Sequence, residues 1–346
     1  MANQQIIIEK QVNLQPFNTF GIAVTASHFV SVSSTEMAQQ LVTRIREDTD
    51  LQKLPRMILG GGSNILLTGD FDGLIIHNQI KGISVIAESE QEVVVCVGAG
   101  ESWHELVLYA IGKGWGGIEN LSLIPGTVGA APMQNIGAYG AEIKDVFVSL
   151  AAVHLQSGDL VTFNKEDCQF GYRQSIFKTS HRDQYMICTV TLRLSKQPEV
   201  NISYGAISET LRQQGIENPG IRDVSQAVIA IRQSKLPDPA QIGNAGSFFK
   251  NPTISNDQFE RLKASFPDIV GYPNNAGVKV PAGWLIEHAG WKGQTKGNVG
   301  VHKNQALVLV NYGGGEGRDI YQLSEEIKQS VREKYGITLE REVNVV

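Results

Sequence analysis

Several features that mark specialised classes of protein are scarce in this sequence of 346 residues. It contains three cysteines, Cys96, Cys168 and Cys188, which are widely spaced and form no Cys-x-x-Cys pair. Neither a disulfide framework nor a zinc site is therefore expected. The seven histidines form no His-x-x-x-His pair, so we expect no bound metal.

Positive charge and long apolar runs are also scarce. The 30 lysines and arginines are outnumbered by 35 acidic residues, which gives a net charge of -5. Binding to a phosphate backbone normally requires a basic excess, so nucleic acid is not an expected partner. No apolar run approaches the roughly 18 residues that span a bilayer, and the first residues do not resemble a secretion signal. We expect a cytoplasmic protein without a membrane partner, and a monomer.

Glycine, in contrast, is abundant and clustered. The 36 glycines are about 10% of the chain, against a usual share of about 7%. Glycine is used where the backbone takes a positive φ or approaches a ligand closely. The hydrophobic and charged fractions, 42% and 19%, are those of an ordinary globular protein. The glycine clusters therefore direct the search for a functional site.

Hydrophobic spacing predicts a mixed α+β protein. Helices are predicted over 34–50, 101–113, 224–235, 258–265, 283–289 and 319–334. Short apolar or β-branched runs predict strands at 57–59, 74–76, 93–97, 148–155, 160–163, 186–192, near 247 and at 306–310. Residues 114–140 show no sustained period and are predicted to form a long functional loop. The change of character after Pro198 places a domain boundary between about 205 and 225.

The first glycine cluster, Leu59-Gly-Gly-Gly-Ser-Asn64, directly follows a predicted strand. Successive backbone N–H groups in such a turn bind anions, and the missing Cβ atoms let a pyrophosphate come close. The cluster has neither the Walker A pattern nor the G-x-G-x-x-G spacing of dinucleotide-binding folds. Phosphate binding is the favoured interpretation, and a hairpin turn is the alternative.

The second cluster runs from Leu123 to Gly140 and holds two prolines and four glycines around Thr127, Gln134 and Asn135. This composition predicts a rigid, extended segment whose N–H and C=O groups can bind a flat heterocycle. A purely structural omega loop is the alternative.

The residues of both clusters closely resemble the FAD-binding half of the UDP-N-acetylenolpyruvoylglucosamine reductase (MurB) family. The matching blocks, in the order of the family, are Gly61-Gly-Ser-Asn64, Pro125-Gly-Thr-Val-Gly129, Gln134-Asn-Ile-Gly-Ala-Tyr-Gly140, Phe170-Gly-Tyr-Arg-Gln-Ser-Ile-Phe-Lys178, Lys235-Leu-Pro-Asp-Pro239 and Gly243-Asn-Ala-Gly-Ser-Phe-Phe-Lys-Asn-Pro252. The resemblance extends from Asn18 to the C-terminus. One glycine loop alone would be a weak signal, but six ordered blocks are specific.

The resemblance implies an α+β fold with a two-part FAD-binding region of the vanillyl-alcohol-oxidase/PCMH type and a C-terminal α/β substrate-binding domain. The implied bounds are 1–78 and 79–222 for the two FAD-binding subdomains and 223–338 for the substrate-binding domain. Residues 339–346 are expected to form a terminal strand that returns to the active site.

The implied activity is the reduction of UDP-N-acetyl-3-O-(1-carboxyvinyl)-glucosamine to UDP-N-acetylmuramate in peptidoglycan precursor synthesis. NADPH would supply the hydride through FAD, so the expected partners are a UDP-sugar and NADPH. Hydride addition leaves negative charge on the carbon next to a carboxylate, and this charge requires fixed positive charge or hydrogen-bond donors.

The resemblance also implies roles for single residues. Arg173 matches the catalytic arginine, whose planar fork can hold a carboxylate with two hydrogen bonds. Ser247 matches the proton donor. Glu342 matches the catalytic glutamate, although strand alternation puts Glu340 on the same face and does not separate the two.

The implied binding residues form two sets. The cofactor-binding set consists of Gly60, Gly61, Gly62, Ser63, Asn64, Pro125, Gly126, Thr127, Gly129, Gln134, Asn135, Gly137, Ala138 and Tyr139. The substrate-binding set consists of Tyr172, Tyr204, Arg232, Lys235, Asn251, Tyr272 and Gln305. Tyr272 resembles the lid tyrosine of one form of the family.

One departure from the family and two alternative functions remain. The family usually has an arginine after Glu-Val near the C-terminus, whereas Val343 is followed here by Asn344. A flavin oxidase or dehydrogenase of the same FAD-fold superfamily would share the glycine loops, but it would not need the Gly-Ser-Phe-Phe-Lys-Asn-Pro block. A catalytically silent nucleotide-sugar binder would not need Arg173, Ser247 and Glu342.

Overall fold

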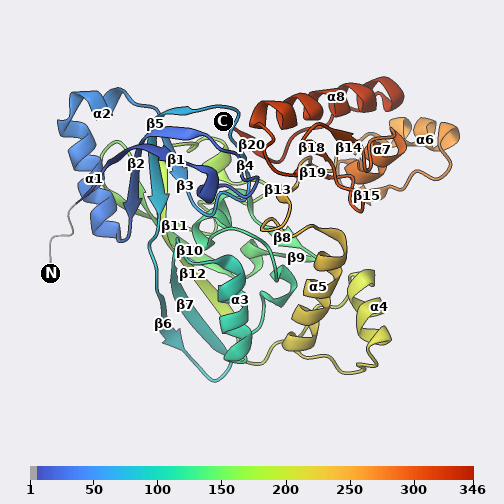
Figure 1. The fold of residues 1–346 in the computed structure, drawn as a ribbon. Coiled ribbons are helices and arrows are strands. Elements are labelled where there is room, and N and C mark those ends of the chain that lie inside the picture. The colour runs from blue at the N-terminus through green and yellow to red at the C-terminus, as the bar shows by residue number, and fades with distance from the viewer. Residues whose placement is uncertain (1–5) are drawn as a thin grey trace. The chain divides into compact units, whose positions relative to one another are not determined.

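The computed structural model describes residues 6–346, which form two compact units (Figure 1). The first unit comprises the segment up to Val12, Ala26–Gly61 and Asp72–Ser234. The second comprises Asn13–Thr25, Gly62–Phe71 and Lys235–Val346. These bounds differ from the domain bounds expected from the sequence, because both expected FAD subdomains fall in one unit while two short early segments join the other.

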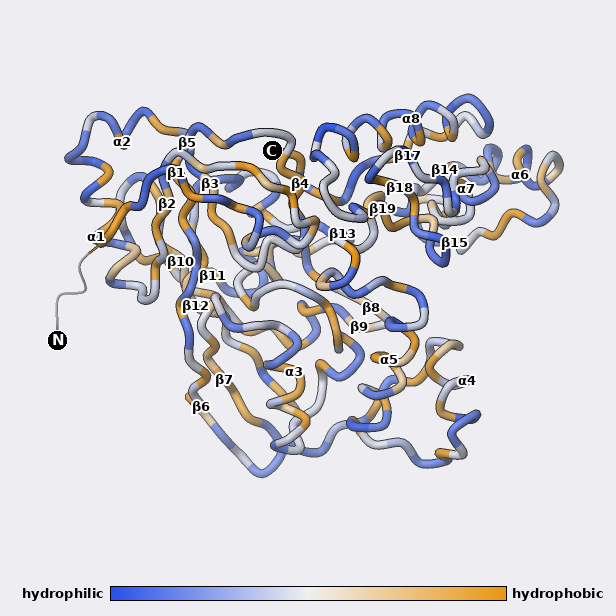
Figure 2. The backbone as a smooth tube through the Cα atoms, in the orientation of Figure 1, coloured by the Kyte–Doolittle hydropathy of each residue, from blue (hydrophilic) through white to orange (hydrophobic). Residues whose placement is uncertain are grey.

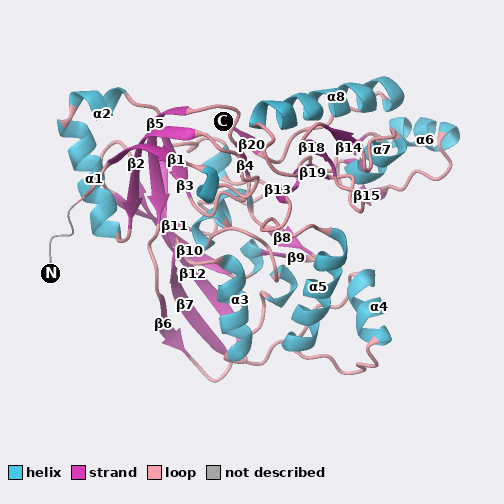
Figure 3. Cartoon of the chain, in the orientation of Figure 1, coloured by secondary structure: helices cyan, strands magenta, loops and turns pink. Residues whose placement is uncertain are grey.

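The first unit contains a four-stranded sheet, a five-stranded sheet and the two-stranded pair β8-β9 (Figure 3). Its strands, some of which extend by a residue or more into the neighbouring segment, are β1 (Glu9–Asn13), β2 (Thr25–Val32), β3 (Arg56–Leu59), β5 (Phe71–Asn78), β6 (Ile83–Glu88), β7 (Glu92–Gly98), β8 (Gly137–Ala138), β9 (Ala141–Glu142), β10 (Phe147–His154), β11 (Leu160–Asn164) and β12 (Tyr185–Ser195). Its helices are α1 (Thr35–Glu47), α2 (Thr49–Lys53), α3 (Trp103–Gly112), α4 (Gly205–Gln213) and α5 (Ile221–Lys235).

The smaller sheet has the order β1-β2-β5-β3, and β3 runs parallel to β5. The apolar face of α1, with Met37, Leu41 and Ile45, packs against buried residues of β2 and β5. The predicted helix over 34–50 is divided in two, because Asp48 ends α1 and its side chain accepts the N–H groups of Asp50 and Leu51 at the start of α2.

The larger sheet has the order β11-β10-β12-β7-β6, and all of its neighbouring strands are antiparallel. Figure 2 shows hydrophobic residues along β12 and β7 and a hydrophilic turn after β6. Helix α3 contributes Trp103, Leu106, Val107 and Ala110 to the core of this sheet. The predicted loop over 114–140 leaves this core and returns to it with only short 3-10 turns, η2 (Glu119–Leu121), η3 (Val128–Ala130) and η4 (Pro132–Gln134), and the two-residue strand β8.

The second unit contains a four-stranded sheet of order β13-β19-β18-β17, a three-stranded sheet of order β14-β16-β15 and the parallel pair β20-β4. Its strands are β4 (Ile65–Leu66), β13 (Gly243–Ser247), β14 (Thr253–Ile254), β15 (Tyr272–Asn274), β16 (Gly277–Lys279), β17 (Thr295–Lys296), β18 (Val299–Val301), β19 (Val308–Asn311) and β20 (Asn344–Val345). Its helices are α6 (Asn256–Ser265), α7 (Ala282–His288) and α8 (Gly317–Tyr335).

The core of the second unit explains why the early segments belong to it. Phe20, Ile22 and Leu66 are buried with the apolar faces of α7 and α8. Phe20 also meets Phe248 edge to face, with the ring centroids 6.3 Å apart. Each helix predicted from the spacing is present, including those over 224–235, 258–265, 283–289 and 319–334. In the part of the chain that the structure describes, every helix is too short or too polar to cross a membrane.

Asn18 holds the early segment of the second unit in place, and its removal is expected to destabilise the fold. Its buried side chain donates to the carbonyls of Leu14 (2.8 Å) and Ile22 (2.9 Å) and accepts the N–H of Ile22 (2.9 Å). Asn18→Ala would leave these groups unpaired, so we expect a loss of about 2–4 kcal/mol in the free energy of unfolding. Denaturant unfolding of protein with equal FAD content measures it.

Asn13→Ala is the matched control, because Asn13 is exposed and its side chain accepts a single N–H, that of Gln15. We expect it to cost less than about 1 kcal/mol. Equal losses for the two variants would contradict the role given to Asn18.

Candidate active site

The two glycine loops meet within the first unit. A Cβ atom added to Gly60, just after β3, would lie 2.5 Å from Thr127 Oγ1. A Cβ atom on Gly61 would lie 3.1 Å from Gly126 Cα. Gly126 itself has a φ of 110°, which other residues rarely adopt. The two loops therefore lie so close that a side chain on Gly60 would collide with Thr127, and one on Gly61 would require the backbone at Gly126 to shift.

The remaining residues of the first loop are packed within the second unit. Gly62 has a φ of 59°, and a Cβ atom there would lie 1.9 Å from the carbonyl oxygen of Phe17. Ser63 and Asn64 are half-buried. The carbonyl of Asn64 accepts two hydrogen bonds from Asn344, one from its backbone N (3.1 Å) and one from Nδ2 (3.0 Å). The residue that departs from the family pattern thus contacts a predicted cofactor loop.

Several residues of the second loop are fixed by packing. A Cβ atom on Gly129 would lie 2.5 Å from the Cβ of Ala99, so this glycine is required by the core. Asn135, with a φ of 44°, is fully buried, and its side chain donates to Glu142 and to the carbonyl of Gly171. The structure therefore uses the Asn135 side chain to shape the loop.

Arg173 stands at the tip of a tight turn in the first unit. Gly171 and Gln174 exchange two backbone hydrogen bonds, of 3.0 and 3.3 Å, around Tyr172 and Arg173. Arg173 has a φ of 54°, and this conformation is energetically unfavourable for any residue other than glycine. Its Nη2 donates to the carbonyl of Gly137 at 2.6 Å. The candidate catalytic arginine is thereby joined to the candidate cofactor loop.

A second arginine, Arg232 on α5, lies near Arg173. Its Nε donates to the carbonyl of Leu123 at 3.2 Å. Its guanidinium is also hydrogen-bonded to the Tyr139 hydroxyl and is repelled by the positive charge of Arg173. The ring of Tyr139 meets that of Tyr204 edge to face at 5.2 Å. Burial lowers the pKa of Arg232 and raises that of Tyr139, since desolvation disfavours the charged forms.

Arg232 lacks the partner that a half-buried cation usually has. Within residues 6–346 it forms no ion pair with a carboxylate. Its contacts are a carbonyl and a phenol, and its charged neighbour, Arg173, has the same sign. Buried charges are normally paired, so this arrangement is suited to an anionic ligand.

Ser247 and Glu342 lie on adjacent segments of the second unit. Ser247 ends β13 and is exposed, after Gly246 with a φ of 69° and an irregularity in the pairing with β19. The N–H of Glu342 donates to the carbonyl of Phe248 at 2.9 Å. Phe248 is fully buried, which fixes the backbone next to Ser247.

Glu340 and Glu342 differ in their surroundings. Glu340 is exposed and its carboxylate pairs with Lys250, whereas the Glu342 side chain is half-buried. A half-buried carboxylate is better suited to a binding site than an exposed one, so burial favours Glu342 as the candidate.

The other predicted substrate residues of the second unit lie at three places. Asn251 Oδ1 accepts the N–H of Ala282 at 2.9 Å, and Gln305 Oε1 would lie 3.2 Å from a Cβ atom on Gly283, so both lie at the first turn of α7. Tyr272, 59% exposed, lies in β15 of the separate three-stranded sheet. Lys235 is exposed at the last residue of α5.

Asn120, which contacts Tyr139, was not singled out by the sequence analysis. Its buried side chain donates to the carbonyls of Tyr139 (3.0 Å) and Asn201 (2.9 Å). It thereby holds Tyr139, which has a φ of 50°. No local pattern in the sequence indicates this contact, because Asn120 and Asn201 are 81 residues apart.

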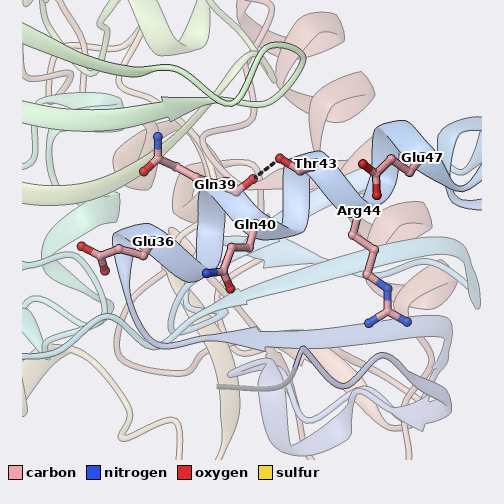
Figure 4. Close-up of a pocket in the computed structure, with 6 residues that line it drawn as sticks. All are labelled: Glu36, Gln39, Gln40, Thr43, Arg44 and Glu47. Carbon is pink, nitrogen blue, oxygen red and sulfur yellow. Dashed lines mark hydrogen bonds between the residues drawn. The ribbon is translucent and has the colours of Figure 1, made fainter. Parts of the chain in front are cut away.

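A pocket beside α1 is not a candidate site (Figure 4). It is lined by polar side chains of that one helix, Glu36, Gln39, Gln40, Thr43, Arg44 and Glu47. The bond drawn in it joins Thr43 Oγ1 to the carbonyl of Gln39 at 3.2 Å, an ordinary contact within a helix. None of the residues predicted to act in binding or catalysis lines this pocket.

Comparison with known proteins decides the family. Residues 238–346 match the C-terminal domain of UDP-N-acetylenolpyruvoylglucosamine reductase, and residues 26–164 match an FAD binding domain. A protein of Amoebophilus asiaticus named UDP-N-acetylenolpyruvoylglucosamine reductase is 51% identical over 98% of this chain and 99% of its own length. The chain belongs to this family. A protein of the same name from Pseudomonas aeruginosa is 46% identical over 98% of each chain.

Solved structures agree on the fold. The reductase from Thermus caldophilus, 22% identical, superposes with a TM-score of 0.68 over 99% of both chains. A 6-hydroxy-D-nicotine oxidase from Arthrobacter nicotinovorans, 11% identical, gives a TM-score of 0.50 over 98% of this chain and 88% of its own. The predicted family and the predicted fold class, with a two-part FAD-binding region, are confirmed.

Membership of the family also confirms two further predictions: the cofactor is FAD, and the protein is an oxidoreductase of peptidoglycan precursor synthesis. The residues of this chain fit the cofactor. Gly60 and Gly61 present bare backbone at the end of β3, and any side chain on Gly61 would press against Gly126. Such a surface allows close approach of a flat or phosphorylated group.

Gly61→Val tests whether this bare backbone is needed for the flavin. We expect the purified variant to hold less than about half of the normal FAD, because the added side chain displaces the second glycine loop. The ratio of flavin to protein absorbance measures the content. Gly112→Ala at the end of α3 is the control, since a Cβ atom there meets nothing within 4 Å. Full flavin content in Gly61→Val would contradict the assignment.

Proposed function

We propose that this protein reduces the enolpyruvyl ether of UDP-N-acetyl-3-O-(1-carboxyvinyl)-glucosamine to the lactyl ether of UDP-N-acetylmuramate, with NADPH as the electron donor. One hydride and one proton are added across the carbon–carbon double bond, and NADPH becomes NADP⁺. The observation that carries this proposal is Arg232, a half-buried guanidinium that lies beside a second guanidinium and has no carboxylate partner among residues 6–346. A nucleotide-sugar carrying a diphosphate and a carboxylate supplies the missing negative charge.

FAD, when bound, transfers the hydride between NADPH and the substrate. We assign its binding to the loop of Gly60, Gly61, Gly62, Ser63 and Asn64, whose successive N–H groups suit a pyrophosphate. The second loop contributes backbone from Pro125, Gly126, Thr127, Gly129, Gln134, Asn135, Gly137, Ala138 and Tyr139.

Each of the two arginines would bind a different anionic group of the substrate. Arg232 would bind the diphosphate, helped by the tyrosines Tyr139 and Tyr204 that pack beside it. Arg173 would hold the carboxylate with two hydrogen bonds, which strengthen as negative charge grows on the adjacent carbon. Its hydrogen bond to the Gly137 carbonyl restricts the movement of the guanidinium.

The two other residues assigned to the reaction itself, Ser247 and Glu342, belong to the second unit. Ser247 would deliver the proton to the carbon next to the carboxylate, because a hydroxyl on a fixed backbone defines the face of delivery. Glu342 would hydrogen-bond the reacting group as its charge develops. Lys235, Asn251, Gln305, Tyr172 and Tyr272 would bind the remainder of the UDP-sugar.

Ser247→Ala separates the two halves of the reaction. We expect flavin absorbance to decrease with NADPH at nearly the normal rate, while its recovery on adding the UDP-sugar slows by about 100-fold or more. Stopped-flow absorbance without oxygen measures both rates. Ser265→Ala, an exposed serine at the end of α6, is the control. Normal recovery in Ser247→Ala would remove this serine from the proposal.

Substitution of the two glutamates tests which one takes part. Glu342→Ala should lower kcat by about 100-fold, because a hydrogen bond to the reacting group is lost. Glu340→Ala should stay within about threefold of wild type, since exposed ion pairs contribute little. Steady-state oxidation of NADPH with the UDP-sugar gives both values. A larger loss in Glu340→Ala would reverse the assignment.

A further inference from the structure

The backbone of Leu123 is held at both of its polar groups by side chains. Leu123 has a φ of 57°, an unusual conformation for a residue with a side chain. Its N–H donates to His104 Nδ1 at 3.0 Å, and its carbonyl accepts from Arg232 Nε at 3.2 Å. His104 is on α3 and Arg232 is on α5, so one strained peptide segment links two helices.

The first turn of α3 fixes this segment at neighbouring points. Trp103 Nε1 donates to the carbonyl of Leu121 at 3.0 Å, and the backbone N–H of Trp103 donates to the carbonyl of Gly126 at 3.0 Å. Trp103 is buried, so these contacts give His104 a rigid base. The residue next to Leu123, Ser122, is bonded to Ser225 of α5 at 2.8 Å.

The hydrogen bond defines the state of the imidazole. Its donor is a backbone N–H, so Nδ1 must be a lone-pair acceptor and the proton of the neutral ring must be on Nε2. Burial lowers the pKa of His104, Glu105 acts against this shift, and the charge of Arg232 adds to it. The ring is therefore a neutral acceptor at pH 7.

We propose that His104 is a positioning residue for substrate binding: it holds the Leu123 peptide in the left-handed conformation that directs its carbonyl to Arg232. This inference rests on the proposed function of Arg232 in binding the UDP-sugar. Without the acceptor on His104, Leu123 can relax to an ordinary φ and its carbonyl moves. Arg232 then loses a fixed partner while the repulsion from Arg173 remains.

The pair His104→Leu and His104→Asn tests the proposal. Leucine fills the space without an acceptor, whereas the Oδ1 of asparagine can take the place of Nδ1. We expect His104→Leu to raise the Kd of the UDP-sugar by about 10-fold to 100-fold, and KM in proportion, with a smaller change in kcat. His104→Asn should restore Kd to within about threefold of wild type.

Calorimetric titration of FAD-loaded protein with the enolpyruvyl UDP-sugar, without NADPH, measures Kd. His154→Leu is the matched control, because His154 Nδ1 also accepts a backbone N–H, that of Ser157 at 3.2 Å, in the turn after β10. It should leave Kd unchanged. A Kd in His104→Leu equal to that of the control, or a Kd in His104→Asn as weak as in His104→Leu, would overturn the proposal.

A double-mutant cycle separates this inference from the function on which it rests. If His104 acts through Arg232, His104→Leu adds no further loss of affinity to Arg232→Ala. Additive losses would overturn the inference. If Arg232→Ala itself leaves Kd unchanged, the proposed role of Arg232 is wrong. If Arg232→Ala weakens binding and His104→Leu does not, only the inference fails.

Discussion

The close contact between two glycine loops is the constraint on which the flavin-binding unit depends. A Cβ atom on Gly60 would collide with Thr127, and one on Gly61 would press against Gly126. The contact requires β3 to end at Leu59 and the long segment after α3 to return to the same place. The sheets, the core around α3 and the 3-10 turns serve to bring these two stretches of bare backbone together.

Positive charge is placed next to this backbone at the cost of conformational strain. Leu123, Tyr139 and Arg173 all take a positive φ. Side chains of other residues hydrogen-bond to the backbone of Leu123 and Tyr139, and Arg173 donates a hydrogen bond from its own side chain. Arg173 and Arg232 are held through backbone carbonyls, and Arg232 is bonded to no carboxylate within residues 6–346. The charge of Arg232 thus remains available to an anionic substrate, and positive charge of this kind stabilises a transition state in which negative charge grows.

Much of this fold and site could be predicted from the sequence, because helix spacing and the glycine blocks are local patterns. The division into units could not, since it depends on where Phe20 and Leu66 are buried. Strand alternation gave no difference between Glu340 and Glu342, whereas the structure shows that Glu340 is exposed and Glu342 is half-buried. The positive φ of Leu123 could not be predicted either, because it is imposed by tertiary hydrogen bonds and not by the local preference of leucine.

The most direct test of the central claim is an anaerobic absorbance measurement on the purified protein. The account predicts a flavin band that disappears on adding NADPH and returns rapidly on adding the enolpyruvyl UDP-sugar. A band that disappears but returns only with oxygen would instead indicate a flavin oxidase or dehydrogenase with another substrate. A protein without a flavin band, even after incubation with FAD, would contradict the account at the contact between the two glycine loops.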